Sequence, residues 1–137
     1  CNNWLILNKE LNDFFGIIMS KNYMGKIYFN LHKLKNSNKH NLDKSKNFYV
    51  ENIKSIKNNI DDGSKIQIFT SFADLMEIAK YEKDEKSYSE YSEELFSLIK
   101  NFFKNENKFF KNIFEKAFIS TFKKSFIPKN KIKEILG

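Results

Sequence analysis

The chain has 137 residues and a formal net charge of +7, with 24 lysines, no arginine and 16% aromatic residues. This much apolar material excludes a disordered chain, and the length suits one domain or two small lobes. One cysteine and two histidines exclude a disulfide framework and a zinc cluster, and no apolar run reaches the roughly 18 residues that would cross a membrane. Because no nucleophile or phosphate-loop motif is present, we expect a protein that is not an enzyme.

The first predicted helix covers residues 4–19, where apolar residues recur at helical spacing. The polar stretch 20–25 predicts a break, and the run 26–29 predicts a short β-strand because Ile, Tyr and Phe favour strands. One or two helical turns are predicted over 30–35. Residues 36–47 are almost all Asn, Lys, Ser, His and Asp, which predicts a solvated loop.

The same order of elements follows in the next segment. A helix is predicted over 47–58, and residues 59–64 then form the strongest turn pattern of the chain, with a glycine that permits positive φ. A second β-prone run covers 65–68 and leads into a helix that ends near Lys80.

The remaining third of the chain is also predicted to be helical. Six acidic residues against two lysines in 81–94 indicate an acidic linker or the solvated start of a long helix. Apolar spacing predicts helices over about 88–103 and 110–122, separated by a polar break. A last helix opens at Pro128, since proline is tolerated at a first helical position. We therefore predict an all-α fold with short β-bridges between loops.

The repeated order of helix, polar break, Ile-centred β run and helix resembles a pair of EF-hands. In a 12-residue loop over 20–31, Gly25 takes position 6 and Ile27 takes position 8. A second loop over 59–70 has Asp61 at position 3. The chain as a whole is similar to calmodulin-like proteins of the EF-hand superfamily, and in style to the degenerate myosin light chains.

This resemblance implies two lobes. Residues 1–80 would hold two degenerate hands, 81–94 would form the acidic linker, and 95–137 would hold one eroded hand and the start of another. Most loop positions lack the oxygen ligands that calcium needs, so we expect no bound metal and no cofactor. The degenerate loop positions are Ser20, Asn22, Gly25, Asn59, Asp61 and Gly63.

The resemblance further implies a non-catalytic light chain or adaptor. Such a protein would clamp an amphipathic helix of a partner, for example a myosin heavy-chain neck, without calcium and without a small-molecule substrate. Taken one by one, its Met and Phe residues also suit a helical core. The candidates for a partner-binding groove are Met19, Met24, Phe72, Met76, Phe103, Phe114 and Phe118.

The positive charge favours a second class, a basic helical-bundle interaction protein. Such a surface would prefer an acidic partner or peripheral contact with an anionic membrane. Lysines and phenylalanines alternate over 104–116, but the Phe spacing fits a buried helical stripe and no Arg is present for base recognition, so we do not expect nucleic-acid binding. The light-chain interpretation implies a cytoplasmic protein, whereas Cys1 would allow a lipid-anchored surface protein.

Overall fold

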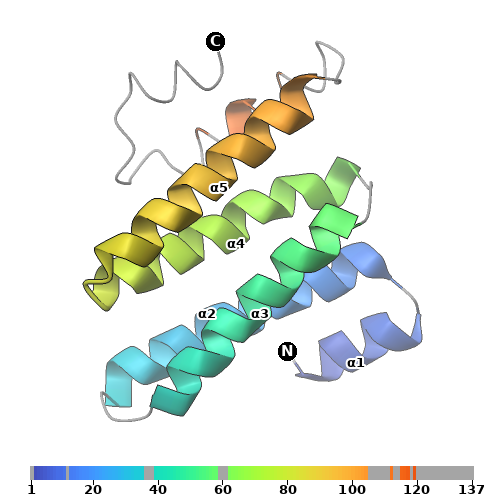
Figure 1. Ribbon diagram of the computed structural model, residues 1–137. Helices are drawn as coiled ribbons and strands as arrows, with labels where there is room; N and C mark the ends of the chain where they lie inside the picture. Colours follow the sequence, from blue (N-terminus) through green and yellow to red (C-terminus); the bar gives the residue numbers. More distant parts are fainter. Residues whose placement is uncertain are drawn as a thin grey trace.

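The computed structural model describes residues 2–11, 13–35, 39–58, 62–104, 112, 115–117 and 119, with only the backbone described at 35, 62–65 and 102–104. These residues contain no β-strand. The five helices with described bounds are α1 (Asn2–Glu10), α2 (Phe14–Lys35), α3 (Lys39–Asn58), α4 (Asp62–Tyr81) and α5 (Glu85–Lys104), and residues 112, 115–117 and 119 are helical as well (Figure 1). The predicted all-α class is therefore confirmed for the described chain.

Short connections make the successive helices run back and forth. The α1 helix folds back on α2, which also packs against α3 and α4, and α5 packs on α4 (Figure 1). Asp13 caps α2 by accepting a 3.0 Å hydrogen bond from the backbone N–H of Gly16. Asp84 caps α5 in the same way, and the hydroxyl and backbone N–H of Ser87 that bond to it lower its pKa.

The turn between α4 and α5 is closed by a left-handed residue. Lys83 has φ 58°, and the N–H of Asp84 donates a 2.8 Å bond to the carbonyl of Ala79. This is the geometry of a helix C-terminal cap in which glycine is the favoured residue, so lysine adopts it at some cost in free energy.

The apolar core lies between α2, α3, α4 and α5, and α4 is its central element. Fully burying one large apolar side chain contributes roughly 1.5–3 kcal/mol, so this set is the main source of stability. The buried core residues are Ile18, Phe29, Leu42, Tyr49, Ile53, Ile56, Ile68, Phe69, Phe72, Leu75, Met76, Ile78, Leu95 and Ile99.

Several local predictions were wrong. The predicted helix 4–19 is two helices, because α1 ends at Glu10 and α2 begins at Phe14. The predicted break 20–25 and β run 26–29 both lie inside α2, so the first EF-hand-like loop is helical in this structure. Tertiary contacts explain this, since the residues that indicated a break are those where other helices touch α2.

The second predicted β run, at 65–68, lies within α4, so neither predicted β-bridge is present in the described chain. The predicted loop 36–47 is also wrong from Lys39 onward, where α3 begins. Here Leu42 and Ser45 are buried against the rest of the bundle, and that packing stabilises a segment whose composition is otherwise polar.

Residues 81–94 were interpreted as an acidic linker or as the solvated start of a long helix. The structure has a long helix that starts at Glu85. Its residues Leu95 and Ile99 belong to the same core as α2, α3 and α4. The division into two lobes stays a prediction, and the predicted helices beyond residue 104 lie largely outside the described residues. None of the described helices is both long and apolar enough to cross a membrane.

Candidate functional site

Four of the seven predicted groove residues have described side chains, and three of these four are inside the bundle. Met24, Phe72 and Met76 are buried, and Met19 is half-buried beside a cavity between α2 and α4. Three more candidates have side chains outside the described set: Phe103, Phe114 and Phe118. The described members therefore pack in the core or line the cavity, and they form no open groove.

The predicted loop positions are also part of the packing. Ser20 is buried and donates a 2.7 Å bond to the carbonyl of Gly16, one turn earlier in α2. Asn22 and Gly25 face neighbouring helices, and Gly63 lies in the first turn of α4. Two further positions, Asn59 and Asp61, lie outside the described residues. Among the side chains that the structure describes, no group of three His, Cys, Asp or Glu could hold a metal ion.

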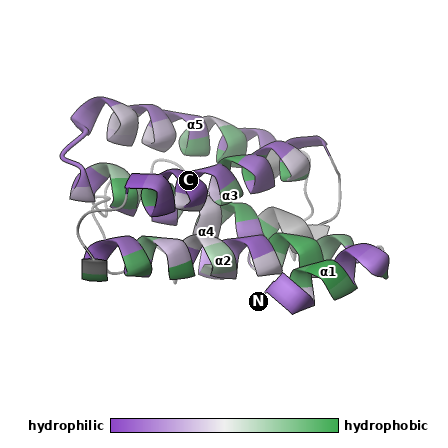
Figure 2. Cartoon of the chain, turned by 90° about the horizontal axis from the view of Figure 1, so that it is seen from below, coloured by the Kyte–Doolittle hydropathy of each residue, from purple (hydrophilic) through white to green (hydrophobic). Residues whose placement is uncertain are grey.

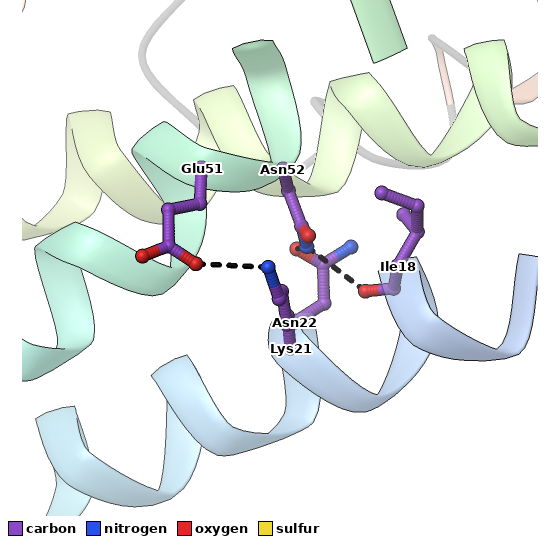
Figure 3. Close-up of polar contacts among 5 residues, drawn as sticks. All are labelled: Ile18, Lys21, Asn22, Glu51 and Asn52. Carbon is purple, nitrogen blue, oxygen red and sulfur yellow. Dashed lines mark hydrogen bonds and ion pairs between the residues drawn. The ribbon is translucent and has the colours of Figure 1, made fainter. Parts of the chain in front are cut away.

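A buried polar network joins α2, α3 and α4. The amide nitrogen of Asn52 donates to the carbonyl of Ile18 and to Oδ1 of Asn22, both at 2.9 Å (Figure 3). The hydroxyl of Ser71 donates to the same Oδ1 at 2.7 Å, and Nδ2 of Asn22 donates to Gln67 at 3.4 Å. Directional bonds of this kind hold the three helices in one register.

Ion pairs on the surface tie α3 to its neighbours. Lys21 of α2 pairs with Glu51 of α3 at 2.8 Å (Figure 3). Two further pairs connect α3 to the turn after α4 and to α5, namely Lys46 with Glu82 and Lys57 with Glu94. Exposed pairs contribute little each, so they bias the arrangement of the helices more than they stabilise it.

A polar cavity of about 220 Å³ opens between α2 and α4. One of its walls is Asp74, whose pKa is raised by burial, while a hydrogen bond from Tyr49 and the charge of Lys26 act in the opposite direction. Oδ2 of Asp74 is buried and has no hydrogen-bond partner. The lining residues are Met19, Asn22, Tyr23, Lys26, Gln67, Thr70 and Asp74.

One face of α2 carries α1 at its beginning. A Cβ at Gly16 would lie 2.6 Å from Cγ and Oδ1 of Asn8, so the side chain of Asn8 from α1 packs directly on Gly16 of α2. Asn8 also donates a 3.1 Å bond to Ser20, and the ring of Trp4 lies 5.9 Å from that of Tyr23. In the view from below, α1 lies along only one end of α2 (Figure 2).

Beyond α1, the same face of α2 is apolar and open. Ile27, Leu31 and Leu34 are 43%, 36% and 82% exposed and follow Tyr23 at intervals of four, eight and eleven residues, which places them on one side of the helix. We call Trp4, Tyr23, Ile27, Leu31 and Leu34 the apolar track. An apolar patch this long is typical of an interaction surface.

The border of the apolar track is basic. α2 contains four lysines and no acidic residue. Lys26 and Lys33 are both exposed and lie seven residues apart, hence two turns apart on the same side of the helix, next to the track. Nζ of Lys33 lies 4.5 Å from the centroid of the Phe29 ring, which directs it along the surface of α2.

Sequence reasoning missed both features. It treated Trp4 only as one of the regularly spaced apolar residues of the predicted helix 4–19, and it made no prediction for Asp74. A signal for Asp74 was present, because it and Glu77 are the only charged residues in the otherwise apolar or neutral run 66–79. Glu77 is exposed, whereas Asp74 is half-buried, and an acid withdrawn from solvent in this way usually has a partner or a role.

These features define the class of the protein, an all-helical bundle with hydrogen bonds across its core, an exposed apolar track and one polar cavity beside it. In comparisons with known proteins, no family model, curated protein or solved structure matches the chain. Its function therefore has to be argued from its own residues.

Proposed function

We propose that this chain is a non-catalytic interaction protein that binds an acidic amphipathic helix of a partner along the apolar track. The observation that supports it most directly is the position of α1. A helix already occupies the first half of this face of α2, at Gly16 and Ser20, and the second half continues with the same spacing but without a cover. A partner helix laid end to end with α1 would continue that packing.

The dimensions suit a short helical segment. From Tyr23 to Leu34 the track runs about 16 Å along α2, which corresponds to about three turns of a partner helix. Covering the exposed parts of Ile27, Leu31 and Leu34 would supply roughly 4 kcal/mol before the costs of association. That gain only offsets the low end of the cost of association, so a weak, reversible complex also needs the contacts with Trp4 and Tyr23 and with the apolar side of the partner helix.

The charge selects the partner. Lys26 and Lys33 border the track, so acidic residues on the flank of the incoming helix would complement them. The same lysines disfavour a second copy of this chain, because two basic borders would then face each other. The proposal thus keeps the helix-binding role that we expected from the sequence and places it on a different, open surface.

The experiment uses Trp4, the sole tryptophan, as a reporter at one end of the track. A synthetic helical peptide with leucines on one face and glutamates beside them is titrated while tryptophan fluorescence is recorded. We expect saturable binding that weakens with salt, and binding at least tenfold weaker when the glutamates are replaced by lysines.

A double variant, Leu31→Ser with Leu34→Ser, should weaken binding of the acidic peptide at least tenfold. The matched control is Val50→Ser, which removes an equally exposed apolar side chain from α3 and should leave binding unchanged. Equal binding of both peptides, or no effect of the double variant, would overturn the proposal. So would self-association in sedimentation, or tight binding to phosphatidylserine vesicles in preference to the peptide.

A further inference from the structure

The cavity between α2 and α4 holds a half-buried carboxylate that the packing of the bundle leaves incompletely satisfied. Asp74 stands on α4 and hydrogen-bonds Tyr49 of α3, yet its Oδ2 has no partner among the described residues. The negative charge of Asp74 is therefore only partly compensated at this wall, and a cationic group of a bound molecule would stabilise it.

The opposite charge lies at the same cavity. Lys26 of α2 is exposed, lines the cavity, and is the cation that acts on Asp74. All other lining side chains are neutral, so the walls carry one negative and one positive group at two different places. A purely cationic or purely anionic ligand would satisfy one of these groups and leave the other unpaired.

The remaining walls determine the size and the contacts of the ligand. The volume of about 220 Å³ is below that of ordinary drug-sized pockets and suits a molecule with only a few heavy atoms. Oδ1 of Asn22 already accepts two hydrogen bonds, so the neutral polar contacts fall to Gln67 and Thr70. Met19 supplies an apolar wall.

From this arrangement we infer that the cavity binds a small zwitterion of the free α-amino acid class, with its ammonium group toward Asp74 and its carboxylate toward Lys26. The bound molecule is a ligand and undergoes no reaction. Recognition rests on two charges of opposite sign held by two helices that the buried network keeps in register. The cavity shares Tyr23 and Lys26 with the proposed helix-binding surface, but the binding of a small zwitterion does not require that a helix binds there.

The test compares three forms of one ligand by NMR titration and thermal unfolding. L-Serine is the zwitterion, N-acetylserine lacks the ammonium group, and serinamide lacks the carboxylate; L-alanine and L-glutamine extend the series in size. We expect the free amino acids to shift the resonances of cavity residues and to raise the melting temperature at millimolar concentration. The two blocked forms should bind at least tenfold more weakly.

Two variants locate the site. Asp74→Asn and Lys26→Met should each weaken zwitterion binding at least tenfold, whereas Lys33→Met, a lysine on the same helix outside the cavity, should not. Lys26 is exposed, so we expect Lys26→Met to fold. This variant therefore tests the inference even if Asp74→Asn fails to fold. Equal binding of blocked and free forms, no binding of any free amino acid, or full binding by Lys26→Met would overturn the inference.

Failure of one proposal is distinguishable from failure of the other. The Leu31→Ser/Leu34→Ser variant alters the apolar track and leaves every cavity residue in place. If that variant loses the acidic peptide and still binds amino acids, the two sites are separate. If it loses the amino acids as well, the cavity does not bind them independently, and the inference fails.

Discussion

Substituting Gly25 by alanine tests the packing of the Tyr49 ring of α3 against α2. An ideal Cβ at this position would lie 2.6 Å from Cζ and 2.9 Å from both Cε atoms of Tyr49. The Tyr49 side chain is only 1% exposed and is held by its hydrogen bond with Asp74, so it cannot swing away. The hydroxyl of Ser45 also donates a 2.6 Å bond to the carbonyl of Gly25, which ties α2 to α3 at this crossing.

Two opposing effects determine the outcome. Replacing a glycine inside a helix by alanine ordinarily stabilises it by about 1 kcal/mol. Here the new methyl group would force the ring or the helix to move by about 1 Å, and overpacking a core costs about 1–3 kcal/mol, occasionally more. Since both backbones would have to give way, we expect the upper part of that range and a net loss of about 1–2 kcal/mol in the free energy of unfolding.

Urea unfolding followed by circular dichroism measures this loss, and Asn30 provides the control. Asn30 is exposed on α2, so the difference between Asn30→Gly and Asn30→Ala reports helix propensity alone. Adding Tyr49→Leu to Gly25→Ala should recover part of the lost free energy of unfolding, because the smaller side chain leaves room for the new methyl group. The double-mutant cycle should therefore give a favourable coupling energy. Gly25→Ala could instead stabilise the protein by as much as Asn30→Ala exceeds Asn30→Gly in free energy of unfolding. That result would show that Tyr49 does not pack closely against Gly25.

Three further predictions concern the core, a turn and one carboxylate. Phe72→Ala should cost about 3–5 kcal/mol because Phe72 is fully buried; a urea midpoint close to that of Leu34→Ala would instead put it on a surface. Lys83→Gly should raise the melting temperature because it relieves the left-handed strain, whereas Lys83→Ala should not. As the pH rises above 3.8, the ordinary pKa of an aspartate, the Asp74→Asn variant should lose less stability than the natural protein does. Urea unfolding at several pH values measures this difference.

The sign of the last prediction follows from the direction of the shift. Because burial raises the pKa of folded Asp74, the folded state holds this proton more tightly than the unfolded state does. The resulting stability is present below pH 3.8 and is lost as pH rises through the folded pKa. Asparagine stays neutral, so the advantage of Asp74→Asn over the natural protein should grow across that interval. A constant difference at all pH values would contradict this reasoning.

The helical class could be predicted from the sequence because period-3.6 apolar spacing persists along most of the chain. The errors fall where small polar residues occur. Ser20, Asn22 and Gly25 have the composition of a turn, and nothing local shows that Asn22 bonds Asn52 and Ser71, which lie 30 and 49 residues away. Tertiary partners of this kind override local propensity, and a single sequence does not reveal them.

The candidate sites were predicted less well than the fold. Spacing alone does not tell which side of an amphipathic helix meets a neighbour, so Trp4 and Ile27 were indistinguishable from core residues. The cavity depends on Lys26 and Asp74, which lie 48 residues apart, and no motif joins them. The excess of lysine suggested an anionic partner, and the absence of any acid from α2 became meaningful only once that helix was placed at the surface.

Both candidate sites depend on how α2 is rotated in the bundle. An apolar core of the same volume would allow a helix to turn about its axis at little cost, because dispersion contacts are not directional. The bonds from Asn52 to Ile18 and Asn22 do not allow this, since a small rotation would leave a buried amide unpaired. A buried Asn specifies register in coiled coils for the same reason. The buried polar network of this protein therefore keeps Ile27 and its neighbours facing outward and Lys26 beside Asp74.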